Sequence, residues 1–236
     1  MNSVIDLPYP PFAHTNHMLN ELLAVKYLNY RNGIFVEAGA ADGFQQSNTW
    51  NLEKFKNWSG VLIEPNVDAF NTCKQIRTQS KVYNVALVEN SFKEKEVKML
   101  QREAYKGDSG LMNTTSFSPL NEEQDWKNLK ILNNYTISAM TLDKVLQDSK
   151  IQFIDFLSLD VEGLELNVLN GFSIKKYLPK IVSIECHINV NEIMYYMAET
   201  HHLIEKVGNF DYIFALKYDP YGFYRDINNE NTYYNF

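Results

Sequence analysis

Acidic and polar residues follow short apolar runs at several points of the chain. The clearest case is Glu37-Ala38-Gly39-Ala40-Ala41-Asp42-Gly43, which comes directly after the apolar run Ile34-Phe35-Val36. Glycines in such a turn let backbone amides approach a ligand closely. In an open α/β sheet, ligands bind at the carboxyl ends of the strands, where the strand order reverses. Further polar residues at predicted strand ends are Glu64, Asn84, Asp160, Glu185 and His187.

The composition of the turn restricts the class of ligand. In the dinucleotide-binding fingerprint G-x-G-x-x-G, the middle glycine lets the backbone approach a pyrophosphate, and here that position is Ala41. The G-K-S/T sequence of a Walker-type phosphate loop is also absent. A nucleoside without phosphates fits better. S-adenosylmethionine (SAM) is one, and its cationic amino acid part favours acidic neighbours such as Glu37 and Asp42. A nicotinamide-dependent oxidoreductase is a minor alternative that Ala41 weakens.

Glu64 ends a second apolar run and lies 21 residues beyond Gly43. A carboxylate at about this distance from a glycine turn can accept hydrogen bonds from both hydroxyls of a ribose. The alternative is that Glu64 caps the helix that follows it. Together, the turn and Glu64 predict a nucleoside site.

Short apolar runs alternate with amphipathic stretches, which indicates βαβ units and a parallel sheet. The predicted fold is α/β, with a mostly parallel, Rossmann-like central sheet, helices on both faces and an antiparallel strand at the C-terminal edge. His201 and His202 fall in the last predicted helix and are expected at its surface. The predicted strands are 34–36, 60–63, 81–88, 153–159, 181–184, 212–216 and 222–227, the last two as a hairpin. The predicted helices are 17–30, 47–55 (capped by Ser47 or Thr49), 67–78, 141–147 (capped by Thr141), 161–171 and 191–207.

The chain divides into an N-terminal extension with a helix (residues 1–32) and one larger domain (residues 33–236). Within that domain, residues 89–140 are predicted to be an irregular insertion with strands at 96–100 and 135–140. Residues 218–236 form an aromatic tail that covers a substrate pocket, packs against a second subunit or frays. The sequence therefore leaves open whether the protein forms a homo-oligomer.

The 236 residues carry a formal net charge of −7, from 22 basic and 29 acidic side chains. Such a chain has no overall field that attracts nucleic acid or anionic lipid. Two cysteines, Cys73 and Cys186, give neither a disulfide framework nor a metal-binding spacing. With no signal peptide pattern and no apolar segment of about 18 residues, a cytoplasmic protein without a membrane span is expected.

Two blocks of sequence resemble the FkbM-type methyltransferases. The first runs from Phe35 to Asn66, with Ser47-Asn48-Thr49, Trp58-Ser59-Gly60 and Leu62-Ile63-Glu64-Pro65-Asn66 as its most recognisable pieces. The second includes Thr141-Leu142-Asp143, Leu159-Asp160-Val161-Glu162-Gly163-Leu164-Glu165 and Leu169-Asn170-Gly171-Phe172. The resemblance covers roughly residues 33–187.

This resemblance implies a class I SAM-dependent methyltransferase domain that transfers a methyl group to a hydroxyl oxygen. The acceptor would be a sugar of a polysaccharide or glycolipid, or another hydroxylated small molecule. Gly39 and Gly43 would line the methionine side of SAM, and Glu64 the ribose. The remaining residues assigned to the cofactor site by this resemblance are Glu37, Ala40, Asp42, Ser47, Asn48 and Asp160, with Asn84, Val85, Ala86 and Ser109 near the adenine.

A hydroxyl is a poor nucleophile until its proton moves to a base. Asp160 is the first candidate base or orienting group, and Glu162 and His187 are the next. Histidine has an unperturbed pKa near 6.5, whereas a carboxyl group needs its pKa raised by burial. Asp160, Glu185 and His187 could also hold a divalent cation at neighbouring strand ends.

Two other functions remain open. One is a methyltransferase for protein or nucleic acid. The acidic net charge disfavours nucleic acid as the substrate. No D/N-P-P-Y/F signature follows the fourth predicted strand, which disfavours methylation of amino groups on bases. The other is a SAM-binding module without catalysis, in a larger biosynthetic complex.

Overall fold

The central sheet has seven strands, five of them parallel. A computed structural model describes residues 23–102, 117–118 and 131–218. The sheet order is β10-β11-β9-β8-β1-β2-β3, in which β11 pairs antiparallel with both of its neighbours, β9 and β10. The expected mostly parallel α/β sheet with an antiparallel edge is therefore confirmed. The strands are β1 (Ile34–Ala38), β2 (Ser59–Ile63), β3 (Lys81–Tyr83), β8 (Phe156–Leu159), β9 (Ile181–Glu185), β10 (His201–Val207) and β11 (Asp211–Leu216).

The strand order reverses beside β1. From β1 the chain proceeds outward through β2 and β3 on one side, and it returns to the other side of β1 with β8 and β9. A reversal of this kind leaves a crevice at the carboxyl ends of the two strands that flank it. The predicted binding turn after β1 and the acidic block after β8 lie at this crevice.

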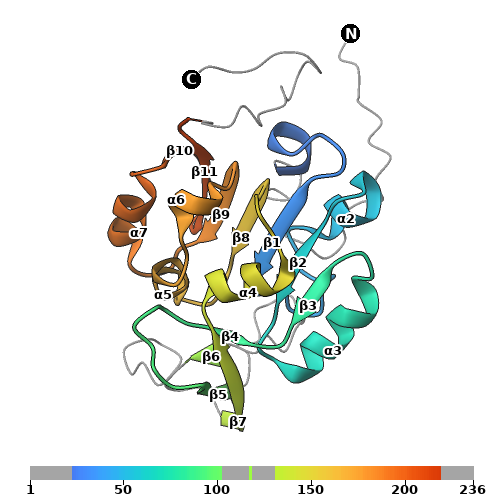
Figure 1. Cartoon of the computed structure of the whole chain (residues 1–236), viewed down its shortest axis with the longest axis vertical. Coiled ribbons are helices and arrows are strands. Elements are labelled where there is room, and N and C mark those ends of the chain that lie inside the picture. Colours follow the sequence, from blue (N-terminus) through green and yellow to red (C-terminus); the bar gives the residue numbers. More distant parts are fainter. Residues whose placement is uncertain (1–22, 103–116, 119–130, 219–236) are drawn as a thin grey trace.

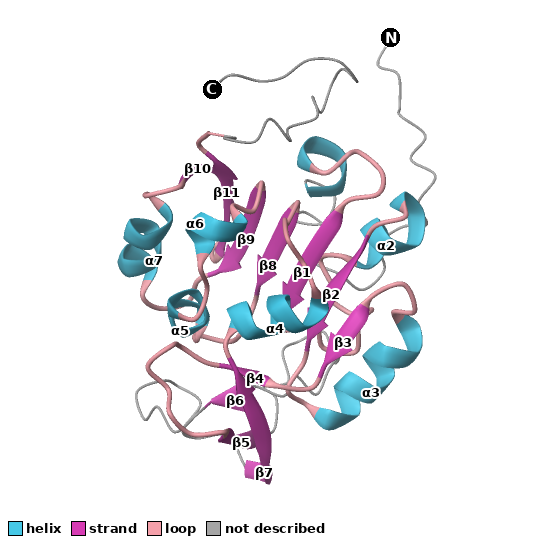
Figure 2. Ribbon diagram, in the orientation of Figure 1, coloured by secondary structure: helices cyan, strands magenta, loops and turns pink. Residues whose placement is uncertain are grey.

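Helices cover both faces of this sheet (Figure 2). One face carries α4 (Leu142–Ser149), α5 (Glu165–Asn170), α6 (Ile174–Tyr177) and α7 (Val190–Met197), whose apolar side chains pack against Val36, Leu157 and Val182. The other face carries the short π-helix η1 (Leu23–Tyr27), α2 (Trp50–Lys56) and α3 (Val67–Ile76), packed against Phe35 and Phe156. Within the described ranges, no helix is both long and apolar enough to cross a bilayer.

A second, smaller sheet lies beyond the carboxyl ends of the parallel strands (Figure 1). It consists of β4 (Ala86–Leu87), β5 (Glu96–Arg102), β6 (Phe117–Ser118) and β7 (Ile131–Met140), in the order β4-β7-β5-β6. The segment expected to be irregular is thus largely strand where it is described. The single strand expected over residues 81–88 is wrong because β3 ends at Tyr83, and the chain then enters the smaller sheet at β4.

The helix expected over residues 191–207 is wrong in its second half. Helix α7 ends at Met197, and residues 201–207 form β10, which pairs antiparallel with β11. The edge hairpin is therefore β10–β11, and the strand expected at 222–227 lies outside the described residues. Of the helix expected over 17–30, residues before Leu23 also lie outside them. The helix expected to be capped at Thr141 is confirmed, because the Thr141 side chain accepts a hydrogen bond from Lys144 N.

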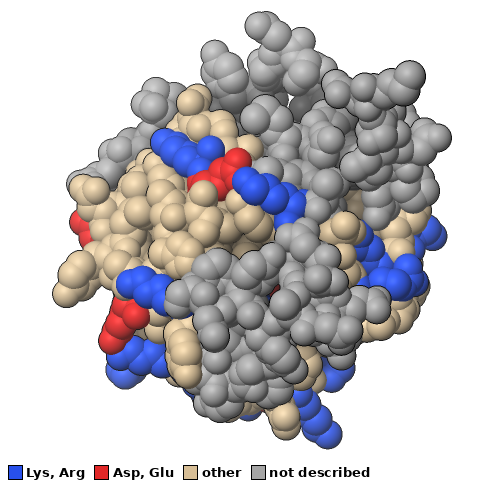
Figure 3. All heavy atoms as spheres, turned by 90° about the horizontal axis from the view of Figure 1, so that it is seen from above, with Lys and Arg blue, Asp and Glu red and all other residues tan. Residues whose placement is uncertain are grey.

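Charges are mixed on the end of the molecule opposite the carboxyl ends of the strands. Figure 3 shows basic and acidic side chains next to each other there, among a larger area of uncharged atoms. The described part of this face therefore presents no continuous basic surface.

His201 is buried rather than on a helix surface. It has 0% exposure, and its Nε2 lies 2.7 Å from the carbonyl oxygen of Pro179. Burial lowers the pKa of His201 from 6.5 to about 4. As the pH falls from 6.5 to 4, the unfolded chain binds a proton that the folded chain rejects. We expect this group to lower the free energy of unfolding by about 1.4 kcal/mol per pH unit in that window.

Urea unfolding at several pH values tests this expectation. His201→Gln should lose most of this pH-dependent slope, whereas His202→Gln, on the same strand, should keep it. Equal slopes in wild type and His201→Gln would contradict the assignment.

Candidate functional site

A cavity of about 280 Å³ opens at the carboxyl ends of β1, β2 and β8, where the strand order reverses. The smaller sheet contributes Leu87 and Met99 to its wall. Of the residues predicted for the site, seven line the cavity: Gly39, Asp42, Glu64, Val85, Ala86, Asp160 and Glu162. The tertiary structure thus brings together residues from three strand ends, of which the first and the last (Gly39 and Asp160) are 121 positions apart in the chain.

Gly39 starts the turn after β1 in a conformation that only glycine adopts easily. Its φ is +85°, and a Cβ atom there would lie 1.7 Å from the carbonyl oxygen of Asp160. The backbones that follow β1 and β8 therefore approach each other more closely than any side chain allows. Ala41, further along the turn, also has a positive φ of 47° and donates its N–H to Glu64 Oε2 at 2.9 Å.

We expect Gly39→Ala to disrupt the cavity. The added methyl group meets backbone rather than a flexible side chain, so the ends of β1 and β8 must separate. Gly208→Ala is the matched control, because Gly208 also has a positive φ (+58°) but has nothing within 4 Å of the added Cβ. Backbone strain alone should lower the free energy of unfolding by about 1 kcal/mol in the control. Urea unfolding should show a clearly larger loss for Gly39→Ala, and equal losses would contradict the close approach.

Glu64 is buried at the cavity wall, and its carboxylate organises the backbone on both sides. Oε2 accepts from Ala41 N, and Oε1 accepts from Asn66 N at 2.7 Å. Burial raises the pKa of Glu64 to about 7, although these two hydrogen bonds oppose the shift. The helix cap is a different residue, since the Asn66 side chain accepts from Ala69 N at the start of α3. Glu64 therefore does not cap α3, which was the alternative that the sequence left open.

Glu37 does not line the cavity. The register pairs Glu37 with Leu62 and Ser158, which directs its side chain to the face covered by α2 and α3. There Oε2 accepts from the Ser47 hydroxyl at 2.9 Å and from Thr49, and Oε1 accepts from Asn48 N at 2.6 Å. Glu37 therefore fixes the shape of the turn from behind it.

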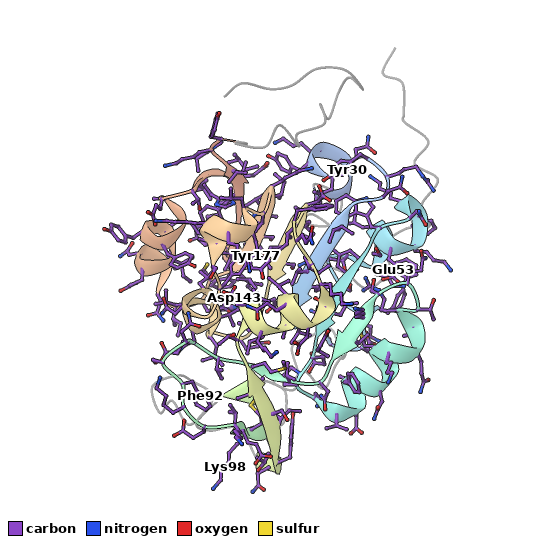
Figure 4. All side chains as sticks on the ribbon, in the orientation of Figure 1. Tyr30, Glu53, Phe92, Lys98, Asp143 and Tyr177 are labelled. Atoms are coloured by element: carbon purple, nitrogen blue, oxygen red, sulfur yellow. The ribbon has the colours of Figure 1, made fainter. Side chains whose placement is uncertain are left out.

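Arg77, which the sequence did not single out, completes this buried polar cluster. It ends α3, is 1% exposed, and donates from Nη1 to Gly43 O (3.2 Å) and Ser47 Oγ (3.0 Å). Its Nε donates to Glu53 of α2 at 3.1 Å (Figure 4 labels Glu53). A lone arginine late in a polar helix gives no sequence signal for such a role. Only the packing of α3 against the turn shows it.

Of the other residues assigned to the cofactor site, some line the cavity and others lie behind its wall. Asp42 lines the cavity and accepts from Phe44 N and Gln45 N, so it also holds the turn. Asn84 holds the backbone of Glu64 and Pro65 through its side-chain amide. The residues outside the cavity lining are Glu37, Ala40, Gly43, Ser47, Asn48 and Asn84, and Ser109 lies outside the described residues.

Further cavity residues carried little sequence signal. They come from the turn after β1, from the region around the end of β2, from the smaller sheet, and from the segment after β8 that leads into α5. Met99 could not be placed from sequence because its strand, β5, pairs with β7, which begins about 30 residues later in the chain. These residues are Ala41, Gln45, Gln46, Ile63, Pro65, Asn66, Ala69, Leu87, Met99, Val161, Leu164 and Val168.

Acidic side chains gather at the ends of β8 and β9. Asp160 and Glu162 line the cavity, and Glu185 is hydrogen-bonded to Asp160. Burial, and then the hydrogen bond with Glu185, raise the pKa of Asp160 well above its usual range. Burial also raises the pKa of Glu162 to about 7 and that of Glu165. A carboxyl group that holds its proton near neutral pH is suited to proton transfer.

His187 stands at the outer side of this group. Its Nε2 lies 3.2 Å from Glu185 Oε1, and its ring packs against Phe210, but it does not line the cavity. In the part of the chain that the structure describes, no three His, Cys, Asp or Glu side chains are arranged to hold a metal ion. The cation site considered for Asp160, Glu185 and His187 therefore has no support in the structure.

The family model of the methyltransferase FkbM domain matches residues 37–214. The chain belongs to the FkbM methyltransferase family. The matched region begins at Glu37 and includes every residue that lines the cavity. The recognition drawn from the two sequence blocks is thereby confirmed. A search of curated proteins gave no match.

Solved structures with a similar fold include other methyltransferases. The FkbM methyltransferase from Methylobacillus flagellatus shares 16% identity with this FkbM-family chain, at a TM-score of 0.47 over 78% of it. The chain covers 43% of that protein's length. A TehB-like SAM-dependent methyltransferase from Corynebacterium glutamicum shares 10% identity, with a TM-score of 0.41 over 85% of this chain and 89% of that one.

Proposed function

We propose that this FkbM-family protein transfers the methyl group of SAM to a hydroxyl oxygen of a sugar, a glycan or a similar hydroxylated small molecule. The observation that carries the proposal is the cavity that holds the Glu64 carboxylate and the Asp160 carboxyl group on opposite sides of the Gly39 turn. The Glu64 carboxylate suits the hydroxyls of a ribose, and the Asp160 carboxyl group suits the proton of an acceptor hydroxyl.

The residues of the cavity fit SAM. Glu64 uses its oxygens for one backbone N–H each, so lone pairs remain for the two ribose hydroxyls. The apolar wall formed by Val85, Leu87 and Met99 suits the adenine ring. Gly39 lets the ends of β1 and β8 approach each other at the cavity, and Asp42 supplies negative charge for the ammonium group. SAM supplies an electrophilic methyl group on a sulfonium.

The chain's own residues would then bind, orient and deprotonate the acceptor. Displacement at a methyl group needs the attacking oxygen in line with the breaking bond, so positioning contributes much of the rate. Asp160 lines the cavity and has a raised pKa, which makes its carboxylate a stronger base than an exposed one. Glu162, also at the cavity, is the second acidic group within reach of an acceptor.

Calorimetric titration with SAM, S-adenosylhomocysteine and NAD tests the cofactor. We expect SAM and S-adenosylhomocysteine to bind and NAD not to bind. Binding of NAD alone would overturn the assignment.

Transfer of a radioactive methyl group from SAM to a panel of p-nitrophenyl glycosides tests the acceptor class. Asp160→Asn should lower kcat about 100-fold or more and leave the SAM Kd within about threefold, because the base acts on the acceptor. Full activity of Asp160→Asn would remove it as the base. If protein or nucleic acid became labelled and the glycosides did not, a protein or nucleic acid acceptor would be favoured. If SAM bound but no methyl group was transferred, a non-catalytic SAM-binding module would be favoured.

The proposal places the reaction in the cytoplasm, with a small-molecule or glycan partner rather than nucleic acid. Both cysteines, Cys73 and Cys186, are free and buried, which is compatible with a reducing compartment. The acidic net charge supports a partner other than nucleic acid.

A further inference from the structure

Glu185 is the last residue of β9 and His187 follows the strand, next to the acidic block of the cavity, but neither lines it. Strands β8 and β9 are parallel neighbours, and Leu159 is in register with Ile184. Asp160 and Glu185 therefore leave the sheet at the same level from adjacent strands. In a parallel pair, side chains in register lie on the same side of the sheet, which brings the two carboxyl groups together.

The side chains of Asp160, Glu185 and His187 lie one after another between the cavity and the protein surface. Asp160 lines the cavity, and its carboxyl group is hydrogen-bonded to that of Glu185. Glu185 Oε1 lies 3.2 Å from His187 Nε2. The His187 side chain is 34% exposed, and Phe210 holds its ring at a centroid distance of 4.2 Å. Both outer residues reach solvent, since the Glu185 side chain is also 27% exposed.

We propose that Glu185 and His187 form a proton exit path that carries the acceptor's proton from Asp160 to solvent. The inference rests on the proposed function. In the reaction, the acceptor oxygen forms a bond to the methyl carbon, and the carbon–sulfur bond breaks with its electron pair going to sulfur. The O–H proton goes to the Asp160 carboxylate. It then passes to Glu185, to His187 and to water, so the three groups return to their starting state.

The surroundings explain why a proton resides in this path. Asp160 faces Glu185, Glu162 and Glu165, and burial removes much of their hydration. Asp211 of β11 is in register with Glu185 on its other side. With so many carboxyl groups close together, a shared proton reduces like-charge repulsion. His187 lies at the outer end of the group, next to Glu185.

A carbon-13 NMR titration of the Asp160 carboxyl carbon tests the first link without any ligand. The resonance is assigned by its loss in Asp160→Asn. We expect Glu185→Gln to lower the pKa of Asp160 by about one unit or more, because the competing carboxyl group is gone. Glu192→Gln, an exposed change of the same kind on α7, should leave it unchanged. An unchanged Asp160 titration in Glu185→Gln would overturn the inference.

Methyl transfer to the best p-nitrophenyl glycoside tests the outer link. His187→Ala should lower kcat about tenfold or more with the KM for SAM unchanged, and added imidazole should restore much of the loss. The matched control, His202→Ala, should show neither effect. A His187→Ala enzyme as fast as wild type, or slowed but not rescued, would overturn the path. If wild type transfers no methyl group, the proposed acceptor class fails, and the Asp160 titration still decides whether the pair is coupled.

Discussion

Glu64→Gln should weaken the binding of SAM by about 100-fold. The carboxylate offers two oxygens, which accept from Ala41 N and Asn66 N and still have lone pairs for a ribose. Glutamine replaces one of these oxygens with an NH₂ group, which is a donor and cannot accept the backbone N–H that the oxygen accepted. The variant loses charge-assisted hydrogen bonds, each worth about 1.5–3 kcal/mol, and 1.4 kcal/mol corresponds to a tenfold change in Kd.

The affinity of wild type should also depend on pH. Because the pKa of Glu64 is about 7 in the folded chain, the group becomes protonated as the pH falls below 7. Protonation removes an acceptor, so SAM should bind about tenfold more weakly near pH 6 than near pH 8. Bound SAM would favour the ionised form and shift this dependence to lower pH in the complex.

Calorimetry of SAM binding at several pH values measures both effects. Asp68→Asn, an exposed charge change in the first turn of α3, is the matched control and should bind SAM nearly as wild type does. Wild-type affinity in Glu64→Gln would contradict the ribose contact. A pH dependence that survives in Glu64→Gln would show that another group titrates.

Arg77→Met should lower the free energy of unfolding by about 3–5 kcal/mol. The substitution keeps an unbranched side chain but leaves the carboxylates of Glu37 and Glu53 buried without their cationic partner. Ser47 and Thr49 lose donors in the same step. An uncompensated buried charge is far less favourable than a broken surface pair, which explains the size of the effect.

Urea unfolding measures this loss. Arg77→Lys retains the charge but not the forked set of donors, so its stability should fall between those of wild type and Arg77→Met. Lys144→Met is the control, because Lys144 forms an exposed i,i+4 pair with Asp148 at 2.7 Å. The control should change stability by about 0.5 kcal/mol or less. Equal losses for Arg77→Met and Lys144→Met would show that the buried cluster contributes no net stability.

Much of the sheet and part of the site could be predicted from the sequence. Continuous apolar runs bounded by turns mark buried parallel strands, because both faces of such strands pack against helices. The same pattern identifies the residues that leave these strands at their carboxyl ends, including Gly39, Glu64 and Asp160. Local sequence patterns therefore predicted part of the set of side chains that meet at the cavity.

Errors occurred where a pairing partner outside the segment decides its conformation. Residues 201–207 fit a continuation of a helix, yet they pair with β11 at the sheet edge. Residues 81–88 are apolar enough for one strand, but Asn84 binds the backbone after β2 and the chain changes sheet. The hydrogen-bonding partner determines the conformation in both cases, and no local pattern contains it.

The turn after β1 shows the same division between sequence and tertiary structure. Its glycines, Asp42 and the distant Glu64 were sufficient to predict a nucleoside site, because backbone geometry and charge are properties of those residues. Whether Glu37 faces the ligand or the protein interior depends on its register with Ser158 and on the position of Arg77. Those contacts form only when α2 and α3 pack on the sheet, so only the tertiary structure could distinguish a residue that binds from one that supports the turn.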